Sequence, residues 1–215
     1  MKIYTTVLFD LDGTLLNTLH DLYDSVNFAL EYLGFTKRTE KEIESFIGRG
    51  TRRLVELALL PETDEKVKAL CFDLFKDHYG SNMCNKTQPY DGIEALLKTL
   101  KRKGIKTGVI SNKADEAVKA LCGFYFPDTL LLACGASAEY GRKPDPGLVL
   151  SALLELGSTH QDTLYVGDTE VDIQTAKNAG IMPVGVSWGF RTKAFLTDRG
   201  ADFVIDRPSE LLCLL

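Results

Sequence analysis

The 215-residue sequence has no apolar run that approaches the length of a membrane span, and the best candidate, residues 129–133, is only strand-sized. The first apolar run ends at Asp10 after three residues, unlike the hydrophobic region of a signal peptide. Five scattered cysteines include no C-x-x-C pair, so the pattern favours reduced thiols over a disulfide framework or a zinc site. These absences predict a cytoplasmic protein with no membrane partner.

The sequence also lacks an excess of basic residues and a phosphate-binding loop of the G-x-x-x-x-G-K-[ST] type. Its formal net charge is −5, whereas a nucleic-acid-binding surface normally carries a clustered basic excess. The composition is otherwise that of an ordinary globular protein, with 45% hydrophobic and 26% charged residues. We therefore expect no nucleic-acid partner.

Residues 16–87 have the pattern of a helical domain. Apolar residues recur there at helical spacing, namely Leu22, Val26, Ala29, Leu30, Leu33, Leu54, Leu57 and Ala58. Thr39 and Glu42 have the spacing of a capping box, which predicts the start of a helix that runs towards Phe46. No segment of this region has the pattern of a strand, so we predict an all-helical unit.

From Pro89 onward, strand and helix patterns alternate along the chain. Strands are predicted at residues 105–110, 129–133, 163–166, 183–187 and 202–205, with helices at 114–121, 146–156 and 171–179 and one that ends at Gly104. Repeated β-α units predict a doubly wound parallel sheet, which also takes in the first strand at residues 7–9. The predicted fold class is α/β, with a core domain of residues 1–15 and 88–215 and an inserted helical cap domain of residues 16–87.

Polar side chains follow three strands of the predicted sheet. Asp10 and Asp12 follow the first strand, Ser111 and Asn112 the strand at 105–110, and Asp168 and Asp172 the strand at 163–166, while Lys143 precedes the helix at 146–156. The carboxyl ends of parallel strands share one edge of the sheet, where open α/β folds bind ligands. We therefore expect these side chains to converge on one site.

These residues resemble the four motifs of the haloacid dehalogenase superfamily, in family order. The motifs are Asp10-x-Asp12-Gly-Thr14, Ser111-Asn112, Lys143-Pro144 and Gly167-Asp168-x-x-x-Asp172. The resemblance covers nearly the whole chain, and the helical insertion matches the cap of the family. It implies that Asp10 attacks phosphorus to form an aspartyl-phosphate, while Asp12 acts first as acid and then as base. It also implies a catalytic, charge-balancing Lys143 and phosphate or substrate contacts at Thr14, Ser111 and Asn112.

A divalent cation is expected at the same place. Four carboxylates accompany one lysine, and two carboxylates ~4 Å apart repel by about 4 kcal/mol at an effective dielectric near 20. The all-oxygen donor set favours Mg²⁺. The resemblance implies that the carboxylates of Asp10 and Asp168 and the backbone carbonyl of Asp12 bind the metal, with Asp172 acting directly or through water.

Asp12 also favours phosphate-ester chemistry, because dehalogenases of the family lack an acid there and phosphonatases typically carry Ala. The overall pattern, including Ile47-Gly-Arg-Gly, Pro89-Tyr-Asp-Gly-Ile and Ser187-Trp-Gly, looks most like phosphoglycolate phosphatases. This implies a phosphatase that acts on a small phosphorylated metabolite such as 2-phosphoglycolate. A pyrophosphatase or a β-phosphoglucomutase of the same family remains open. A receiver-type signalling domain and a regulator that only binds a metabolite are further alternatives, which the helical insertion and the intact aspartate pair disfavour.

The loop at residues 47–53 is the best candidate for substrate specificity. Gly48 and Gly50 favour a tight loop between helices, where Arg49 is a candidate contact for a substrate anion. The alternative is a helix–helix turn with solvated arginines. The sequence leaves the oligomeric state open between monomer and homodimer.

Overall fold

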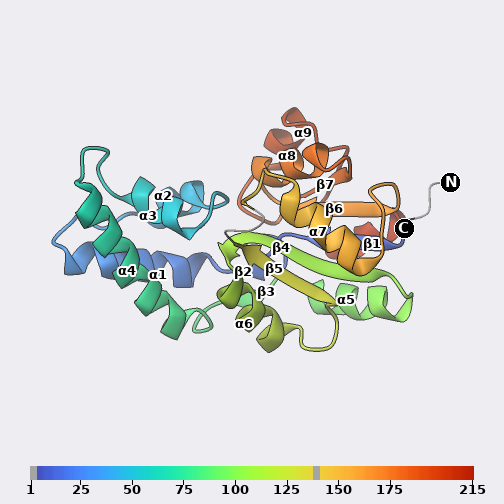
Figure 1. Ribbon diagram of the computed structural model, residues 1–215, viewed down its shortest axis with the longest axis horizontal. Coiled ribbons are helices and arrows are strands. Elements are labelled where there is room, and N and C mark those ends of the chain that lie inside the picture. The colour runs from blue at the N-terminus through green and yellow to red at the C-terminus, as the bar shows by residue number, and fades with distance from the viewer. Residues whose placement is uncertain (1–3, 138–140) are drawn as a thin grey trace.

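The computed structural model describes residues 4–137 and 141–215, which form a sheet flanked by helices and a separate group of helices (Figure 1). Six parallel strands pair in the order β5-β4-β1-β6-β7-β8. Their bounds are β1 Thr6–Phe9, β4 Lys106–Ala114, β5 Leu132–Ala136, β6 Thr163–Gly167, β7 Met182–Val186 and β8 Phe203–Ile205. The chain runs from β1 through β4 to β5 and returns to β6 on the other side of β1. Such a reversal of winding is where open α/β sheets bind ligands.

Helices cover both faces of the sheet, because β1 is apolar on both sides. Val7 and Phe9 belong to one core cluster, with apolar residues of α5 (Ile93–Arg102), α6 (Asp115–Tyr125) and the 3₁₀ helix η1 (Pro208–Cys213). Leu8 belongs to a second cluster, with α7 (Gly147–Leu156) and α8 (Glu170–Asn178). The short helix α9 (Lys193–Asp198) packs against β7 and β8. Burial on both sides holds the carboxyl end of β1 firmly in the middle of the sheet.

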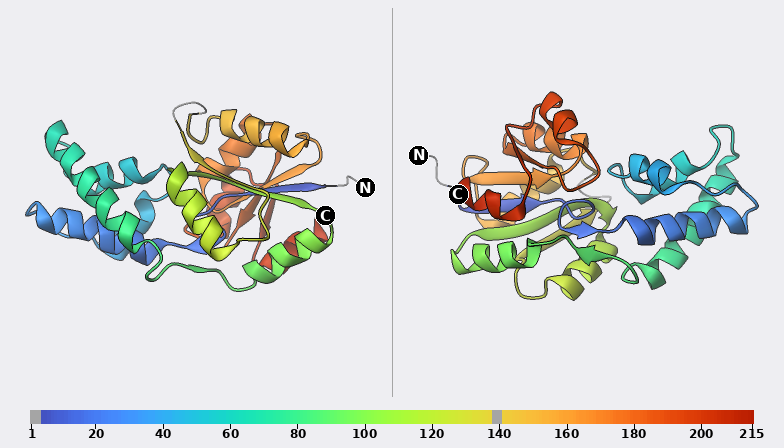
Figure 2. Two further views of the ribbon diagram at one scale, coloured as in Figure 1. Left: turned by 60° about the horizontal axis from the view of Figure 1, so that its bottom comes forward. Right: turned by 180° about the vertical axis from the view of Figure 1, so that it is seen from behind.

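Four helices between β1 and α5 form a unit with an apolar core of its own. They are α1 (Leu19–Tyr32), α2 (Glu40–Phe46), α3 (Thr51–Ala58) and α4 (Glu65–Asn82), and we call them the helical unit. The capping box predicted at Thr39 and Glu42 is present at the start of α2. Figure 2 shows the helical unit beyond one end of the sheet. Within the described residues, no helix is both long enough and apolar enough to span a bilayer.

The α/β fold class with a parallel sheet is confirmed, but two strand positions differ from the prediction. β4 continues to Ala114, so residues 111–113 lie inside the strand rather than after it. β5 begins at Leu132 rather than at residue 129, because the Thr129 N–H still closes a turn onto the carbonyl of Phe126 at 3.3 Å. Apolar character alone does not show at which residue the turn ends and the strand begins.

A second, two-stranded sheet lies where the chain leaves the core and where it returns. β2 (Leu16–Asn17) pairs antiparallel with β3 (Gln88–Pro89). The sequence predicted no strand at residues 16–87, and β2 corrects that expectation. A strand of two residues has no period from which to predict it.

The buried carboxylate of Asp21 ties these two chain crossings together. Asp21 lies in the first turn of α1 and is 1% exposed. It accepts the N–H of Lys86 at 3.0 Å and the N–H of Thr87 at 2.8 Å. The nearby Asp24 makes a different kind of contact, an exposed ion pair with the Lys86 ammonium at 2.6 Å. The two acids therefore form a matched pair, one buried and one at the surface.

We expect Asp21→Ala to lower the free energy of unfolding by about 2–3 kcal/mol, because it leaves two backbone N–H groups without their charged acceptor. Asp24→Ala should cost less than about 1 kcal/mol, as is usual for an exposed ion pair. Urea denaturation of both variants measures the difference. Equal losses from the two substitutions would contradict the role assigned to Asp21.

Candidate active site

Asp10 follows β1 directly, at the point where the winding of the sheet reverses. Its N–H donates to the carbonyl of Val166 on β6 at 2.9 Å, and its Oδ1 accepts the N–H of Leu11 at 2.7 Å. Gly13 then turns the chain with a φ of 84°, and a Cβ at this position would collide with the Asp168 carboxylate. Glycine is required there both for the backbone angle and for the close approach.

Asp10, Asp168 and Asp172 form a buried cluster of carboxylates. Each offers an oxygen that lies within 4.8 Å of those of the other two. Asp168 accepts the Thr14 hydroxyl at 3.0 Å and the Phe190 N–H at 2.8 Å. These three acids, which follow β1, follow β6 and lie in the first turn of α8 respectively, thus meet at one edge of the sheet.

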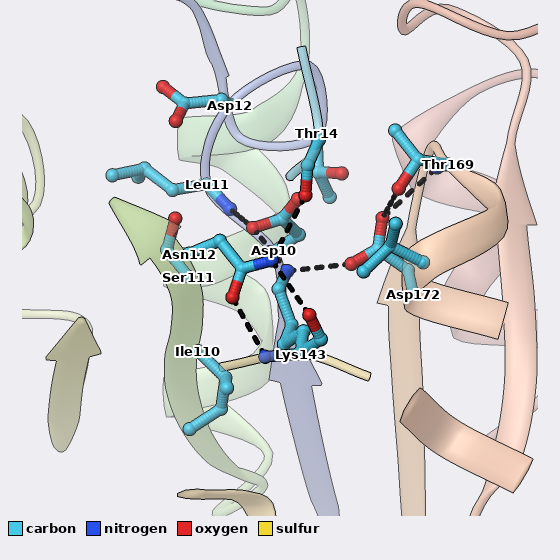
Figure 3. Close-up of polar contacts among 12 residues, drawn as sticks. Asp10, Leu11, Asp12, Thr14, Ile110, Ser111, Asn112, Lys143, Thr169 and Asp172 are labelled. Carbon is cyan, nitrogen blue, oxygen red and sulfur yellow. Dashed lines mark hydrogen bonds and ion pairs between the residues drawn. The ribbon is translucent and has the colours of Figure 1, made fainter. Parts of the chain in front are cut away.

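Lys143 lies among these carboxylates (Figure 3). Its ammonium is 2.8 Å from Asp10 Oδ1 and 2.7 Å from Asp172 Oδ1, and its side chain is 2% exposed. The Asn112 side chain positions the backbone of Lys143, because its Oδ1 accepts the Lys143 N–H at 2.8 Å and its Nδ2 donates to the Lys143 carbonyl at 3.1 Å. The amide of Asn112 thus aligns the loop that brings Lys143 to the site.

The carboxylates exceed the positive charge available to them. Burial, and next the carboxylate of Asp172, raises the pKa of Asp10 to about 7. Burial and the same neighbour raise the pKa of Asp168 well above its ordinary range. Burial would lower the pKa of Lys143, but the charges of Asp10 and Asp172 outweigh it and raise that pKa. Three buried carboxylate donors with a deficit of positive charge fit a hard divalent cation such as Mg²⁺.

The Asp12 carboxylate points away from Lys143 and Asp172 (Figure 3). Its Oδ1 accepts the Thr18 hydroxyl at 2.7 Å and lies 3.0 Å from the Lys113 ammonium. The two aspartates of the first motif therefore face different surroundings, one a cluster of carboxylates and the other a buried lysine. The side chain of Asp12 takes no part in the carboxylate cluster.

A small cavity of about 20 Å³ lies between the sheet and the helical unit. From the core it is lined by the pair Asp10 and Asp12 and by residues 111–113 of β4, while Leu22, Ile47, Gly48, Gly50, Thr51 and Leu54 line it from the helical unit. Ser111, 2% exposed, is therefore placed against the same cavity as Asp10. The small size of this space favours a small ligand.

The loop between α2 and α3 rests on the core. The Gly48 carbonyl accepts Asn112 Nδ2 at 3.0 Å, and a Cβ at Gly48 would come within 3.3 Å of Thr169. Arg191 donates to the backbone carbonyls at the end of α2, including that of Ile47 at 3.2 Å. These contacts close the cavity on the side of the loop.

Two predicted substrate contacts occupy other positions in the structure. The Arg49 side chain is 63% exposed and pairs with Glu170 at 3.6 Å, outside the residues that line the cavity. The hydroxyl of the buried Thr14 is directed to Asp168, so it supports a carboxylate. A lysine that the sequence did not predict, Lys113, lines the cavity instead. The sequence held one signal for Lys113, which is that it continues the polar run Ser-Asn-Lys directly after the apolar residues of a strand.

Comparison with known proteins places this arrangement in a family. A family model described as haloacid dehalogenase-like hydrolase matches residues 7–186. Phosphoglycolate phosphatases of Aquifex aeolicus and Haemophilus influenzae are 34% and 33% identical over 97% and 96% of this chain, and 95% and 96% of their own lengths. A crystal structure of a protein from Lactobacillus delbrueckii has a TM-score of 0.91 at 33% identity, over 98% of this chain and 97% of that one. The likeness extends over the sheet and the helical unit together.

The raised pKa of Asp10 predicts how the stability of the metal-free protein depends on pH. With a pKa of about 7 when folded and the ordinary 3.8 when unfolded, the folded state holds the extra proton between these values. The contribution of this carboxyl to the free energy of unfolding is fully present below about pH 4 and is lost as the pH rises through 7. We expect the wild type to lose about 2–3 kcal/mol relative to Asp10→Asn between about pH 5 and pH 8.

Urea denaturation of both proteins in EDTA measures this difference, since asparagine mimics the neutral carboxyl at every pH. A constant difference between the two proteins over this range of pH would contradict the raised pKa.

Proposed function

This chain belongs to the haloacid dehalogenase-like hydrolases and is a phosphoric monoester hydrolase, and we propose that it works through an aspartyl-phosphate on Asp10. One observation carries the proposal: Asp10 lies at the carboxyl end of β1, beside Lys143 and two further carboxylates, and faces a small cavity that Asp12 also lines. An anionic nucleophile attacks a phosphate dianion only where nearby cations offset the charge.

Two steps account for hydrolysis. In the first, an Asp10 carboxylate oxygen bonds to phosphorus, the bond to the ester oxygen breaks, and Asp12 gives its proton to the departing oxygen. In the second, Asp12 takes a proton from a water molecule that attacks the aspartyl-phosphate. Inorganic phosphate leaves, and both carboxyl groups return to their starting states.

The carboxylates of Asp10 and Asp168 and the backbone carbonyl of Asp12 would hold Mg²⁺, with Asp172 acting directly or through water. When bound, Mg²⁺ supplies positive charge that offsets the carboxylates and the phosphate. Asp172 also holds Lys143 in place, and its second oxygen accepts the Thr169 N–H at 3.0 Å. Thr14 contributes by orienting Asp168, which is a narrower role than the direct phosphate contact predicted for it.

The phosphoryl oxygens would be bound by the Ser111 hydroxyl, the backbone N–H of Asn112 and the ammonium of Lys143. Ser111 and Asn112 line the cavity beside Asp10, and Lys143 is buried next to it. Buried donors that face developing negative charge stabilise a transition state more strongly than solvated ones.

The best candidate substrate is 2-phosphoglycolate. The two relatives described above are named phosphoglycolate phosphatases, and the small cavity favours a small ester over a large one. We propose that residues 16–87 form a cap domain on a core of residues 1–15 and 88–215, and that the cap selects the ester. Arg49 remains a proposed anion contact, for which a substrate has to compete with Glu170. All five cysteines are free thiols, which supports a reducing compartment such as the cytoplasm.

We expect the purified protein to hydrolyse 2-phosphoglycolate faster than pyrophosphate, nucleoside monophosphates or β-glucose 1-phosphate, and to lose activity in EDTA. Asp10→Asn should lower kcat by at least about 10³-fold, because the amide is no nucleophile. Phosphate release measures the panel, and circular dichroism checks that the variant is folded. Full activity of the folded Asp10→Asn variant, or of the wild type in EDTA, would refute the mechanism. Faster release of phosphate from pyrophosphate than from 2-phosphoglycolate would identify a pyrophosphatase, and isomerisation of β-glucose 1-phosphate would identify a mutase.

The acid role of Asp12 predicts a dependence on the leaving group. Asp12→Ala should lower kcat on an alkyl phosphate by about 10²–10⁴-fold. The loss should be smaller for the first step with p-nitrophenyl phosphate, whose leaving group departs without a proton. A rapid-quench measurement of nitrophenol release isolates that step. The same loss on both esters in the first step would exclude Asp12 as the acid.

A further inference from the structure

Lys113 is a buried cation that the proposed reaction does not use. It lies near the end of β4, and its side chain is 1% exposed. Its ammonium is 3.0 Å from Asp12 Oδ1 and 3.0 Å from the Tyr79 hydroxyl. It also lies 4.7 Å from the centroid of the Tyr79 ring, in a cation–π contact. A lysine is rarely buried so completely without a specific partner or ligand.

The Lys113 ammonium has one donor to spare. An ammonium carries three N–H groups, of which Asp12 and Tyr79 take two. Within residues 4–137 and 141–215, no third acceptor for this ammonium is present. Lys113 lines the cavity together with Asp12 and Ser111, so a ligand in the cavity lies beside this residue.

Two other cations near the cavity, Lys143 and Arg49, are already engaged. Lys143 pairs with Asp10 and Asp172 at 2.8 Å and 2.7 Å, on the phosphate side of the site. Arg49 pairs with Glu170 and does not line the cavity. The helical unit adds mainly apolar side chains to the wall, such as Leu22 and Leu54. Among the described residues that line the cavity, Lys113 is the one cation, and it lies beside Asp12, where it can bind an anionic group of a substrate.

We propose that Lys113 determines specificity by binding a carboxylate on the leaving group of the substrate. The inference rests on the proposed function, in which the ester oxygen must reach Asp12 to receive a proton. An atom held against Asp12 lies close to Lys113, because the ammonium and Oδ1 are 3.0 Å apart. A carboxylate one or two bonds beyond the ester oxygen then falls within reach of the spare N–H. Lys113 selects short acidic esters over neutral esters of the same length.

Tyr79 makes this recognition depend on the helical unit. Tyr79 lies on α4 and is 4% exposed, whereas Lys113 lies on β4 of the sheet. Its hydroxyl and its ring hold the ammonium from the side opposite the sheet. The helical unit thus orients a core lysine and adds no charge of its own to the contact.

A series of esters with the same two-carbon backbone tests the proposal on the wild-type enzyme. The probes are 2-phosphoglycolate, 2-hydroxyethyl phosphate and 2-aminoethyl phosphate, which carry a negative, a neutral and a positive end group. We expect kcat/KM for the acid to exceed that for the neutral ester by about 10- to 100-fold, the range of one charge-assisted hydrogen bond. The amine should be the poorest substrate.

Variants then assign the preference to a residue. Lys113→Met should reduce the ratio of kcat/KM between 2-phosphoglycolate and 2-hydroxyethyl phosphate by at least about 10-fold, whereas Lys113→Arg should keep most of it. Arg49→Ala is the matched comparison and should change the ratio less than Lys113→Met does. If Lys113→Met does not fold, the wild-type series still tests the preference for the acidic ester, and Lys113→Arg tests whether another cation at this position keeps it.

Hydrolysis of both esters at equal rates by the wild type, or an unchanged ratio in Lys113→Met, would overturn the role of Lys113 and leave the phosphatase mechanism intact. Hydrolysis of none of the three esters in Mg²⁺, together with no activity on an aryl phosphate, would instead refute the proposed function.

Discussion

The crowding of buried carboxylates around a single lysine is the constraint on which the rest of this structure depends. Asp10, Asp168 and Asp172 are each no more than 5% exposed, and Lys143 offsets only part of their charge. Such a cluster is tolerated only when hydrogen bonds and cations compensate for lost hydration. Much of the surrounding structure serves that end, from the Thr14 hydroxyl on Asp168 to the Thr169 cap that holds Asp172.

The proposed chemistry and the proposed selectivity involve different neighbours of one cavity. Asp10 lines the cavity and lies beside Lys143, Asp168 and Asp172, which are outside the helical unit. Asp12 and Lys113 also line the cavity, and there Tyr79 of the helical unit contacts the Lys113 ammonium.

Particular residues show how far the sequence could predict this site. Asp10, Asp168 and Asp172 of the first and fourth motifs do cluster, because parallel strands bring their carboxyl ends together, whereas the Asp12 carboxylate lies outside that cluster. Lys113 was overlooked, since a lysine beside a strand is usually solvated and its burial arises from Tyr79, 34 residues away. Arg49, the proposed anion contact, pairs with Glu170 of a distant helix, a partner that the sequence did not indicate. β2 escaped prediction because two residues have no period.

The sequence by itself determined the α/β order of elements, the helical insertion and the residues that can carry phosphate chemistry. Those properties follow from local periodicity and from motifs a few residues long. Only the tertiary structure decided which charges compensate one another: Asp12 with Lys113, Asp10 and Asp172 with Lys143, and Arg49 with Glu170. Each of these pairs joins residues far apart in the chain. The partners of Lys113 and Lys143 meet when the strands of the sheet assemble, and Arg49 meets Glu170 when the helical unit packs against the core.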